Sequence, residues 1–281
     1  MGFLSFFRKS KNVSVIPLNG IIAPNMGRRK GLNLNEIDKN IEQAFSVKNL
    51  KAVALQINLP GGSPVQSEMI SQRIRSLSEK NNVPVLAFIE DVAASGGYWL
   101  AISGDEIFVD SNSIIGSIGV VYSGFGFSNA LEKLGVERRL HTAGERKAML
   151  DPFSPERPAD IEKLKEIQNQ MHENFMDIVK LRRGQRLKSE KTDLFSGEFW
   201  LGKQAIELGL VDGLGELVSV LKERFGEDVK LRRISLRRGW FRRRFSILGF
   251  SPVDHENLGG SFASGAISAI ESRSLWARFG L

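Results

Sequence analysis

The chain has 281 residues, and its shares of apolar (42%) and charged (25%) residues are typical of a packed globular protein, which excludes wholesale disorder. Its net charge is +7, and it contains no cysteine, so a cysteine nucleophile, disulfides and thiolate metal sites are excluded. Only His141, His172 and His255 are present, so a histidine-rich metal site is hard to build. A Ser-His-Asp triad would have to use one of these three.

Residues 1–12 form a segment that is first apolar and then basic, which is the reverse of the order in a cleavable signal. No run of roughly eighteen uncharged apolar residues occurs, so the sequence predicts no transmembrane helix. We therefore expect a cytoplasmic protein of a bacterium-like cell, or one attached to a membrane surface.

The first half of the chain alternates between strand and helix patterns. Buried strands are expected at 13–18, 52–57 and 83–89, because these are apolar runs that end at turn residues. Apolar residues at helical spacing predict a helix over 34–45. A second helix is expected from Pro64 to about Lys80, with Ser63 as its N-cap.

The pattern continues in the second half. A short helix is expected at 98–102, followed by strands at 106–109, 117–122 and 136–142 and helices at 128–134, 158–183, 202–208 and 214–225. Such alternation predicts an α/β layered domain with largely parallel strands. We expect this domain to span residues 13–226.

The composition changes in the expected extension, residues 227–281. The segment 229–248 carries eight basic residues and no acidic one, interleaved with Trp240, Phe241 and Phe245. Contact with anionic lipid head groups is one interpretation; a subunit-contact arm and a solvated tail are two others. Nucleic-acid binding is not expected, because no recognised nucleic-acid-binding fold accompanies the arginines.

Two glycine-rich loops directly follow apolar strands. The first contains Gly61 and Gly62, and the second contains Ser95, Gly96 and Gly97. Active-site loops of open α/β sheets lie at the carboxyl ends of strands. Glycines let a backbone approach a substrate, and two N–H groups can form an oxyanion hole. The structural alternative is that Ser95 is only a helix cap and the glycines only make turns.

A serine hydroxyl needs a base to act as a nucleophile. The sequence around Ser95 is not a G-x-S-x-G elbow, because Ala93 stands at the first glycine position. His141 is one candidate base, although no acidic partner for it is evident. A neutral lysine is the other route, and Lys147 is the candidate, with an ordinary surface lysine as the alternative.

Four segments together resemble the signal peptide peptidase A family, the protease IV-type serine peptidases. They are Asn58-Leu59-Pro60-Gly61-Gly62, Asp91 to Tyr98, Ile115 to Val120, and Gly144 to Phe153. Leu59 stands where the family usually has serine. The resemblance covers roughly residues 13–225 and matches the single-domain type; the N-terminal transmembrane helix of membrane-tethered relatives finds no counterpart.

The resemblance implies a crotonase/Clp protease-like spiral of strand-helix units with a Ser-Lys dyad. Ser95 would attack the scissile carbonyl, Lys147 would take its proton, and Ser117 would orient the lysine. Backbone N–H groups of Gly61 or Gly62 and of Gly96 would hold the oxyanion. The resemblance also implies peptide substrates such as signal-peptide remnants, a ring- or dome-like homo-oligomer, and no metal or organic cofactor.

Two other functions remain open from the sequence. A crotonase-like acyl-CoA enzyme would use the same glycine loops on a thioester without needing Ser95 or Lys147. A non-catalytic oligomeric scaffold would keep the fold, and Ser95 would not react with a serine-directed probe.

Overall fold

The computed structural model of the chain describes residues 10–25, 31–188, 192–235 and 273–281. Eight strands form one sheet: β1 (Asn12–Asn19), β2 (Leu50–Leu59), β3 (Val85–Ala94), β4 (Glu106–Val109), β5 (Ile114–Gly116), β6 (Phe199–Leu201), β7 (Gly213–Leu214) and β8 (Lys230–Arg233). The helices are α1 (Leu34–Phe45), α2 (Pro64–Asn81), α3 (Gly96–Ala101), α4 (Ser128–Lys133), α5 (Pro158–Arg183), α6 (Gly202–Glu207) and α7 (Leu217–Phe225), with a 3₁₀ turn at Gly184–Arg186. The predicted α/β class is confirmed.

The sheet runs in the order β6-β5-β3-β2-β1-β8, and β4 also pairs with β3 and with β7. All pairs are parallel except β5 with β6. On the side away from β2, strand β3 pairs with two strands in succession. Its first half pairs with β4, and its last three residues pair with β5. This long strand brings the loops after β2, β3 and β5 to the same edge of the sheet.

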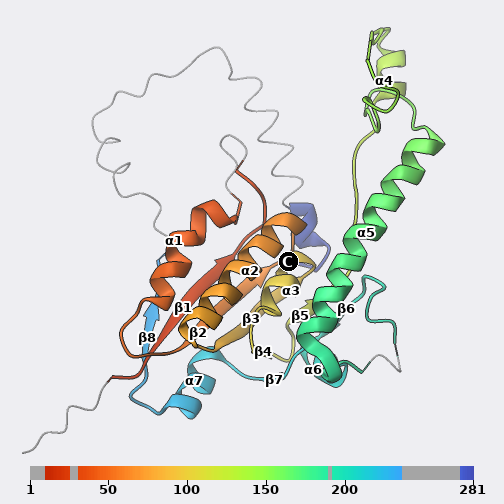
Figure 1. Cartoon of the computed structure of the whole chain (residues 1–281). Helices are drawn as coiled ribbons and strands as arrows, with labels where there is room; N and C mark the ends of the chain where they lie inside the picture. Colours follow the sequence, from red (N-terminus) through yellow and green to blue (C-terminus); the bar gives the residue numbers. More distant parts are fainter. Residues whose placement is uncertain (1–9, 26–30, 189–191, 236–272) are drawn as a thin grey trace, which may run out of the picture.

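Alternating side chains of each central strand serve two apolar layers. In β2, Val53 and Leu55 contact the layer under α1, α2, α3 and α5, whereas Ala52 and Ala54 face α7. Figure 1 shows α1, α2 and α3 side by side over the central strands. The expected N-cap of α2 is present: the Ser63 side chain accepts a hydrogen bond from the Gln66 N–H at 3.4 Å, and Pro64 is the first residue of the helix.

Two expected strands are absent. Residues 117–122 and 136–142 adopt no strand conformation. Each segment contains apolar residues, but neither has a neighbouring strand in the described chain with which to pair. Ser117 and Ile118 are buried beside the sheet. The chain then enters the tip, residues 120–157, which contains the exposed segment 136–142 and α4 and projects beyond the start of α5 (Figure 1).

The sheet continues past residue 226. Strand β8 pairs with β1, and Ile234 is only 4% exposed. At the C-terminal side, Phe279 packs against Val92 and Ala94 of β3. The expected N-terminal segment falls outside the described residues up to position 9, as do residues 236–248 of the basic segment.

No helix in the described ranges combines the length and the apolar character needed to cross a lipid bilayer.

Candidate active site

Ser95 occupies a sharp turn between β3 and α3. Its backbone angles are φ 52° and ψ −122°, a conformation that a residue with a side chain adopts only under strain. Although Ser95 stands at the cap position of α3, its side chain makes no cap hydrogen bond. A strained strand-to-helix turn that presents a serine hydroxyl is the geometry of a nucleophile elbow. The interpretation of Ser95 as a mere helix cap therefore loses its basis.

The two glycine loops meet at Ser95. Parallel pairing of Leu59 with Ala93 places the ends of β2 and β3 side by side. A Cβ built on Gly61 would lie 3.0 Å from the Ser95 Cβ and 3.4 Å from its hydroxyl oxygen. Ile22 and Gly62 form a bridge in which the Ile22 N–H donates to the Gly61 carbonyl and the Ser63 N–H donates to the Ile22 carbonyl.

That bridge does not use the N–H of Gly62. The N–H of Gly96, in the first turn of α3, has no carbonyl partner within the helix. A Cβ on Gly62 would lie 1.9 Å from the Ile22 carbonyl oxygen, so only glycine fits there without a backbone shift. The two loops thus lie beside Ser95, and the N–H groups of Gly62 and Gly96 are the candidates for oxyanion donors.

Ser117 lies next to this group. The Ser95 N–H donates to the Gly116 carbonyl at 2.8 Å, and the pairing of Ala94 with Gly116 continues toward Ser117. Ser117 is 7% exposed, has a φ of 52°, and is held by its N–H to the Glu198 carbonyl at 2.6 Å. Ser95, Ser117, Gly61, Gly62 and Gly96 are therefore brought together.

Lys147 is not part of this group within one chain. It lies exposed in the tip, where its N–H donates to the Gly144 carbonyl, and its amine has no hydrogen bond or ion pair with any described residue. The tip is joined to the start of α5, whereas α3 contacts α5 at Phe175, through a ring stack with Trp99 at 4.8 Å. Phe175 lies 17 residues after Pro158, which is about 25 Å along a helix. Exposed His141 belongs to the same tip.

The tip has its own packing. The Phe127 and Phe153 rings stack at 5.6 Å, and the Phe127 N–H donates to the Pro152 carbonyl. Arg138 forms a two-pronged ion pair with Asp151 at 2.9 and 3.0 Å. Figure 1 shows α4 at the far end of α5 from α3.

A small pocket adjoins Ser95. Its volume is about 20 Å³, and it is lined by Gly62, Pro64, Ser95, Gly96, Trp99, Gly119, Val120, Met171 and Phe175. Sequence reasoning missed the contribution of α5, because Met171 and Phe175 follow an apolar helical spacing that indicates ordinary packing. His172, which follows Met171 in α5, has its Nε2 atom 3.1 Å from the Ile118 carbonyl oxygen.

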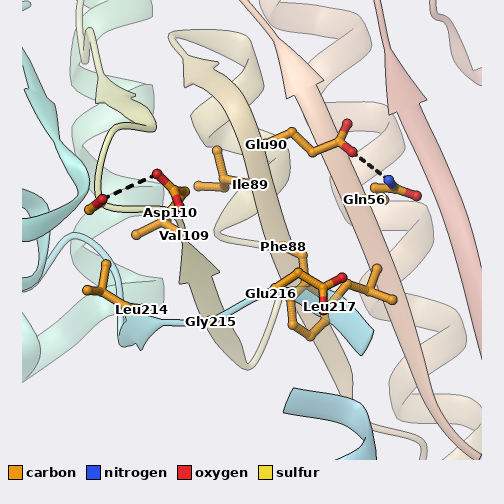
Figure 2. A pocket seen from close by; sticks show the side chains of 11 residues that line it. Gln56, Phe88, Ile89, Glu90, Val109, Asp110, Leu214, Gly215, Glu216 and Leu217 are labelled. Carbon is orange, nitrogen blue, oxygen red and sulfur yellow. Dashed lines mark hydrogen bonds between the residues drawn. The ribbon is translucent and has the colours of Figure 1, made fainter. Parts of the chain in front are cut away.

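A larger pocket of about 470 Å³ lies near α7 (Figure 2). Its carboxylates already have partners: Glu90 accepts from Gln56 at 2.5 Å, and Glu216 accepts from the Ser219 N–H that it caps. Asp110 accepts from the Asn112 N–H, which lowers the pKa of Asp110. Its lining residues include no counterpart of the strained turn at Ser95 beside Gly61, so Ser95 is the stronger candidate for an active-site residue.

The model of the Peptidase family S49 matches residues 78–231, more than half of the chain. The chain belongs to this family. The match includes Ser95, Ser117 and Lys147. A putative signal peptide peptidase SppA of Enterococcus faecium is 30% identical over 73% of this chain and 60% of its own length, in agreement with the family resemblance expected from the sequence.

A Brucella melitensis protein named Na(+)/H(+) antiporter NhaA is 45% identical over 96% of this chain. This chain spans only 37% of that protein's length, so the name was given to a protein much longer than the part that matches this chain.

Among solved structures, the 1510-N membrane-bound stomatin-specific protease, as a lysine-to-alanine variant in complex with a substrate peptide, covers 85% of this chain and 98% of its own. The TM-score is 0.53 and the identity 16%, which shows a shared fold. The fold is the Clp protease/crotonase type expected from the sequence.

Proposed function

We propose that this S49 chain is a serine endopeptidase that cleaves hydrophobic peptides such as signal-peptide remnants, with Ser95 as its nucleophile. The observation that carries the proposal is the strained elbow at Ser95, whose hydroxyl makes no cap bond and faces the Gly61–Gly62 loop. A fold maintains a strained residue only where the surroundings enforce it, and such residues cluster at active sites.

In the proposed reaction, the Ser95 hydroxyl oxygen attacks the scissile carbonyl carbon while a base takes its proton. The carbonyl oxygen becomes an oxyanion, which accepts hydrogen bonds from the N–H groups of Gly62 and Gly96. The protonated base gives its proton to the amide nitrogen as the C–N bond breaks, which releases the amine and leaves an acyl-serine. Water, deprotonated by the same base, then attacks the acyl carbon, and the serine oxygen leaves and regains a proton as the acid is released. Donors already fixed in place stabilise this charge without reorganisation, which is commonly the largest contribution to such a rate.

The proposed base is Lys147 in its neutral form, oriented by Ser117. Because Lys147 and Ser95 are separated by most of the length of α5, we propose that a second copy of the chain supplies the lysine. The exposed apolar side chains of the tip support this arrangement, since a subunit contact would cover them. They are Val121, Tyr122, Phe125, Phe127, Leu134, Val136, Leu140 and Phe153.

The test measures cleavage of a fluorogenic hydrophobic peptide by the full chain and by Ser95→Ala. Loss of the activated nucleophile should reduce turnover by about a million-fold. Wild type should also be labelled by a fluorophosphonate probe, with Ser95 as the modified residue.

The outcomes separate the alternatives. Peptide cleavage that survives in Ser95→Ala would contradict the proposal. Binding of an acyl-CoA thioester by wild type and Ser95→Ala alike, with no peptide cleavage by either, would instead support an acyl-CoA enzyme. Absence of both activities together with no probe labelling would leave the scaffold function.

A further inference from the structure

The wall of the pocket beside Ser95 is closed by two aromatic rings. Trp99 of α3 is 6% exposed and Phe175 of α5 is 3% exposed, and their rings stack at 4.8 Å with an interplanar angle of 18°. Both line the 20 Å³ pocket together with Ser95. The rings are held by two separate helices, so the wall is fixed by packing on both sides.

A second, larger pocket also borders Trp99. It measures about 360 Å³ and lies between α2 and α5, where Ser71, Asn174 and Ile178 are among its lining residues. Trp99 lines both pockets. The same residue therefore borders a very small space at Ser95 and a much larger one.

The position of the small pocket determines what would enter it. It is lined by Ser95, Gly62 and Gly96, so under the proposed function a carbonyl attacked by Ser95 lies beside it. The side chain of the residue that supplies this carbonyl begins two bonds from the attacked carbon. Trp99, Phe175, Val120 and Met171 supply the pocket's large side chains, and none of its lining residues is charged.

The volume sets the size of that side chain. One water-sized group needs about 10–15 Å³ on the same measure, so a pocket of about 20 Å³ has room for one methyl-sized group. A leucine or phenylalanine side chain would have to displace Trp99 or Phe175, and closely packed aromatic rings resist such a displacement.

We infer that Trp99, supported by Phe175, is the specificity-determining residue of the site and restricts cleavage to bonds that follow a small residue such as alanine, glycine or serine. This inference rests on the proposed peptidase function. It gives the hydrophobic substrate a defined position: its bulky residues must lie away from the residue at the scissile carbonyl.

The experiment compares kcat/KM for peptides that differ only in the residue before the scissile bond: glycine, alanine, leucine or phenylalanine. Cleavage positions are mapped by mass spectrometry. Wild type should prefer alanine over leucine by at least about ten-fold, since each methylene that does not fit changes kcat/KM by about 10–200-fold. Trp99→Ala should join the two cavities and reduce or reverse this ratio by about ten-fold or more.

Two further variants keep the result interpretable. Phe175→Leu removes the support of the indole ring without emptying the site, and should shift the ratio in the same direction if Trp99→Ala does not fold. Phe108→Ala is the matched control, because Phe108 stacks on Phe88 at 5.3 Å with the same 18° angle, outside the residues lining the Ser95 pocket. It should lose stability and leave the ratio unchanged.

Equal cleavage after alanine and leucine by wild type would overturn the inference while leaving the peptidase function intact. An unchanged ratio in folded Trp99→Ala and Phe175→Leu would do the same. Absence of cleavage of every peptide by wild type, or cleavage that persists in Ser95→Ala, would overturn the proposed function and the inference with it.

Discussion

The sheet edge around Ser95 and the tip around Lys147 differ in how the chain holds them. Ser95 and Ser117 lie among paired strands and glycine loops, with an apolar layer on each side of the central strands. Lys147 lies in a segment whose side chains are mostly exposed and whose packing comes from its own residues. One chain thus holds the proposed nucleophile and oxyanion donors within its sheet and, separately, presents a lysine amine that has no partner among the described residues.

The largest expected effect is complementation between two inactive variants. Ser95→Ala and Lys147→Ala should each be inactive alone. When they are mixed under conditions that allow subunit exchange, about a quarter of the sites in a random 1:1 assembly should pair an intact serine with an intact lysine. Recovery of peptidase activity toward that fraction is the measurement.

Failure to recover activity despite demonstrated subunit exchange would mean that both residues act within one chain. A mixture of Ser95→Ala with Ser117→Ala is the matched control. Both residues belong to the same sheet edge, so a site that takes only its lysine from the other copy gains nothing from this mixture.

Gly62→Ala and Gly126→Ala compare the same substitution in the two regions. At Gly62 the φ is +138° and the new Cβ would meet the Ile22 carbonyl oxygen, whereas nothing lies within 4 Å at Gly126. We expect Gly62→Ala to lower kcat by about 100-fold or more through the displaced oxyanion donor. Gly126→Ala should change neither kcat nor the thermal midpoint appreciably, and equal effects of both would contradict the assignment of Gly62.

Two ion pairs provide a comparison of stability. Arg183 and Asp212 pair at 2.8 and 3.0 Å with side chains 2% and 18% exposed, whereas Arg139 and Glu137 of the tip pair at 2.9 Å with side chains 76% and 73% exposed. Removing one charge of a buried pair costs about 3–5 kcal/mol, and an exposed pair contributes about 0–1 kcal/mol. Asp212→Asn should therefore lower the free energy of unfolding by about 3 kcal/mol or more, and Glu137→Gln by less than about 1 kcal/mol.

The effect of Asp212 should depend on pH. Desolvation acts to raise the pKa of Asp212, but hydrogen bonds and charge from Arg183, with the Ile107 N–H and Arg186, outweigh it and leave the pKa below its ordinary value. A carboxylate with a lowered pKa stabilises the fold above the unfolded-state pKa, near 4, and this contribution fades as the pH falls through the lower folded-state value. Denaturation measured from about pH 6 to pH 3 should show the gap between wild type and Asp212→Asn narrowing below about pH 4; a constant gap would count against it.

The smallest expected effect on the folded chain is that of Phe125→Ser. Phe125 is 69% exposed in the tip, so its loss should change the unfolding free energy of the isolated chain by no more than about 0.5 kcal/mol. If the tip contacts another copy, the variant should nevertheless shift sedimentation toward smaller species and lose activity in parallel. An unchanged oligomer distribution would remove Phe125 from the subunit contact.

Local patterns predicted the regular elements well. The helices over 34–45 and 158–183 have the expected bounds, because their apolar spacing and flanking residues agree. The strand predicted at 136–142 is wrong: its apolar residues suit a strand, but no described strand lies beside it to pair with it. Strands β6 and β8 were not predicted, because they are short edge strands whose only signal is their pairing with a neighbour. In the sequence, β8 is part of a basic run, and only its pairing with β1 shows it to be a strand.

The candidate site was likewise predicted only in part. Glycine spacing indicated Gly61, Gly62 and Gly96, and strand pairing accounts for their meeting Ser95. The strained angles of Ser95 could not be foreseen, because its sequence lacks the glycine pattern of the elbow. The roles of Trp99 and Phe175 depend on how α3 crosses α5, which an apolar spacing alone does not reveal.

The short strand β5 has a consequence for the timing of biosynthesis. Its three residues lie between β3 and β6, and the Ser117 N–H is held by Glu198, more than eighty positions later in the chain. Residues 198–201 must therefore be synthesised before the backbone around Ser95 and Ser117 can reach its final conformation. Contacts between residues so far apart in the sequence form late in folding. Under the proposed function, a nascent chain would therefore lack a complete site around Ser95 until most of the domain has emerged.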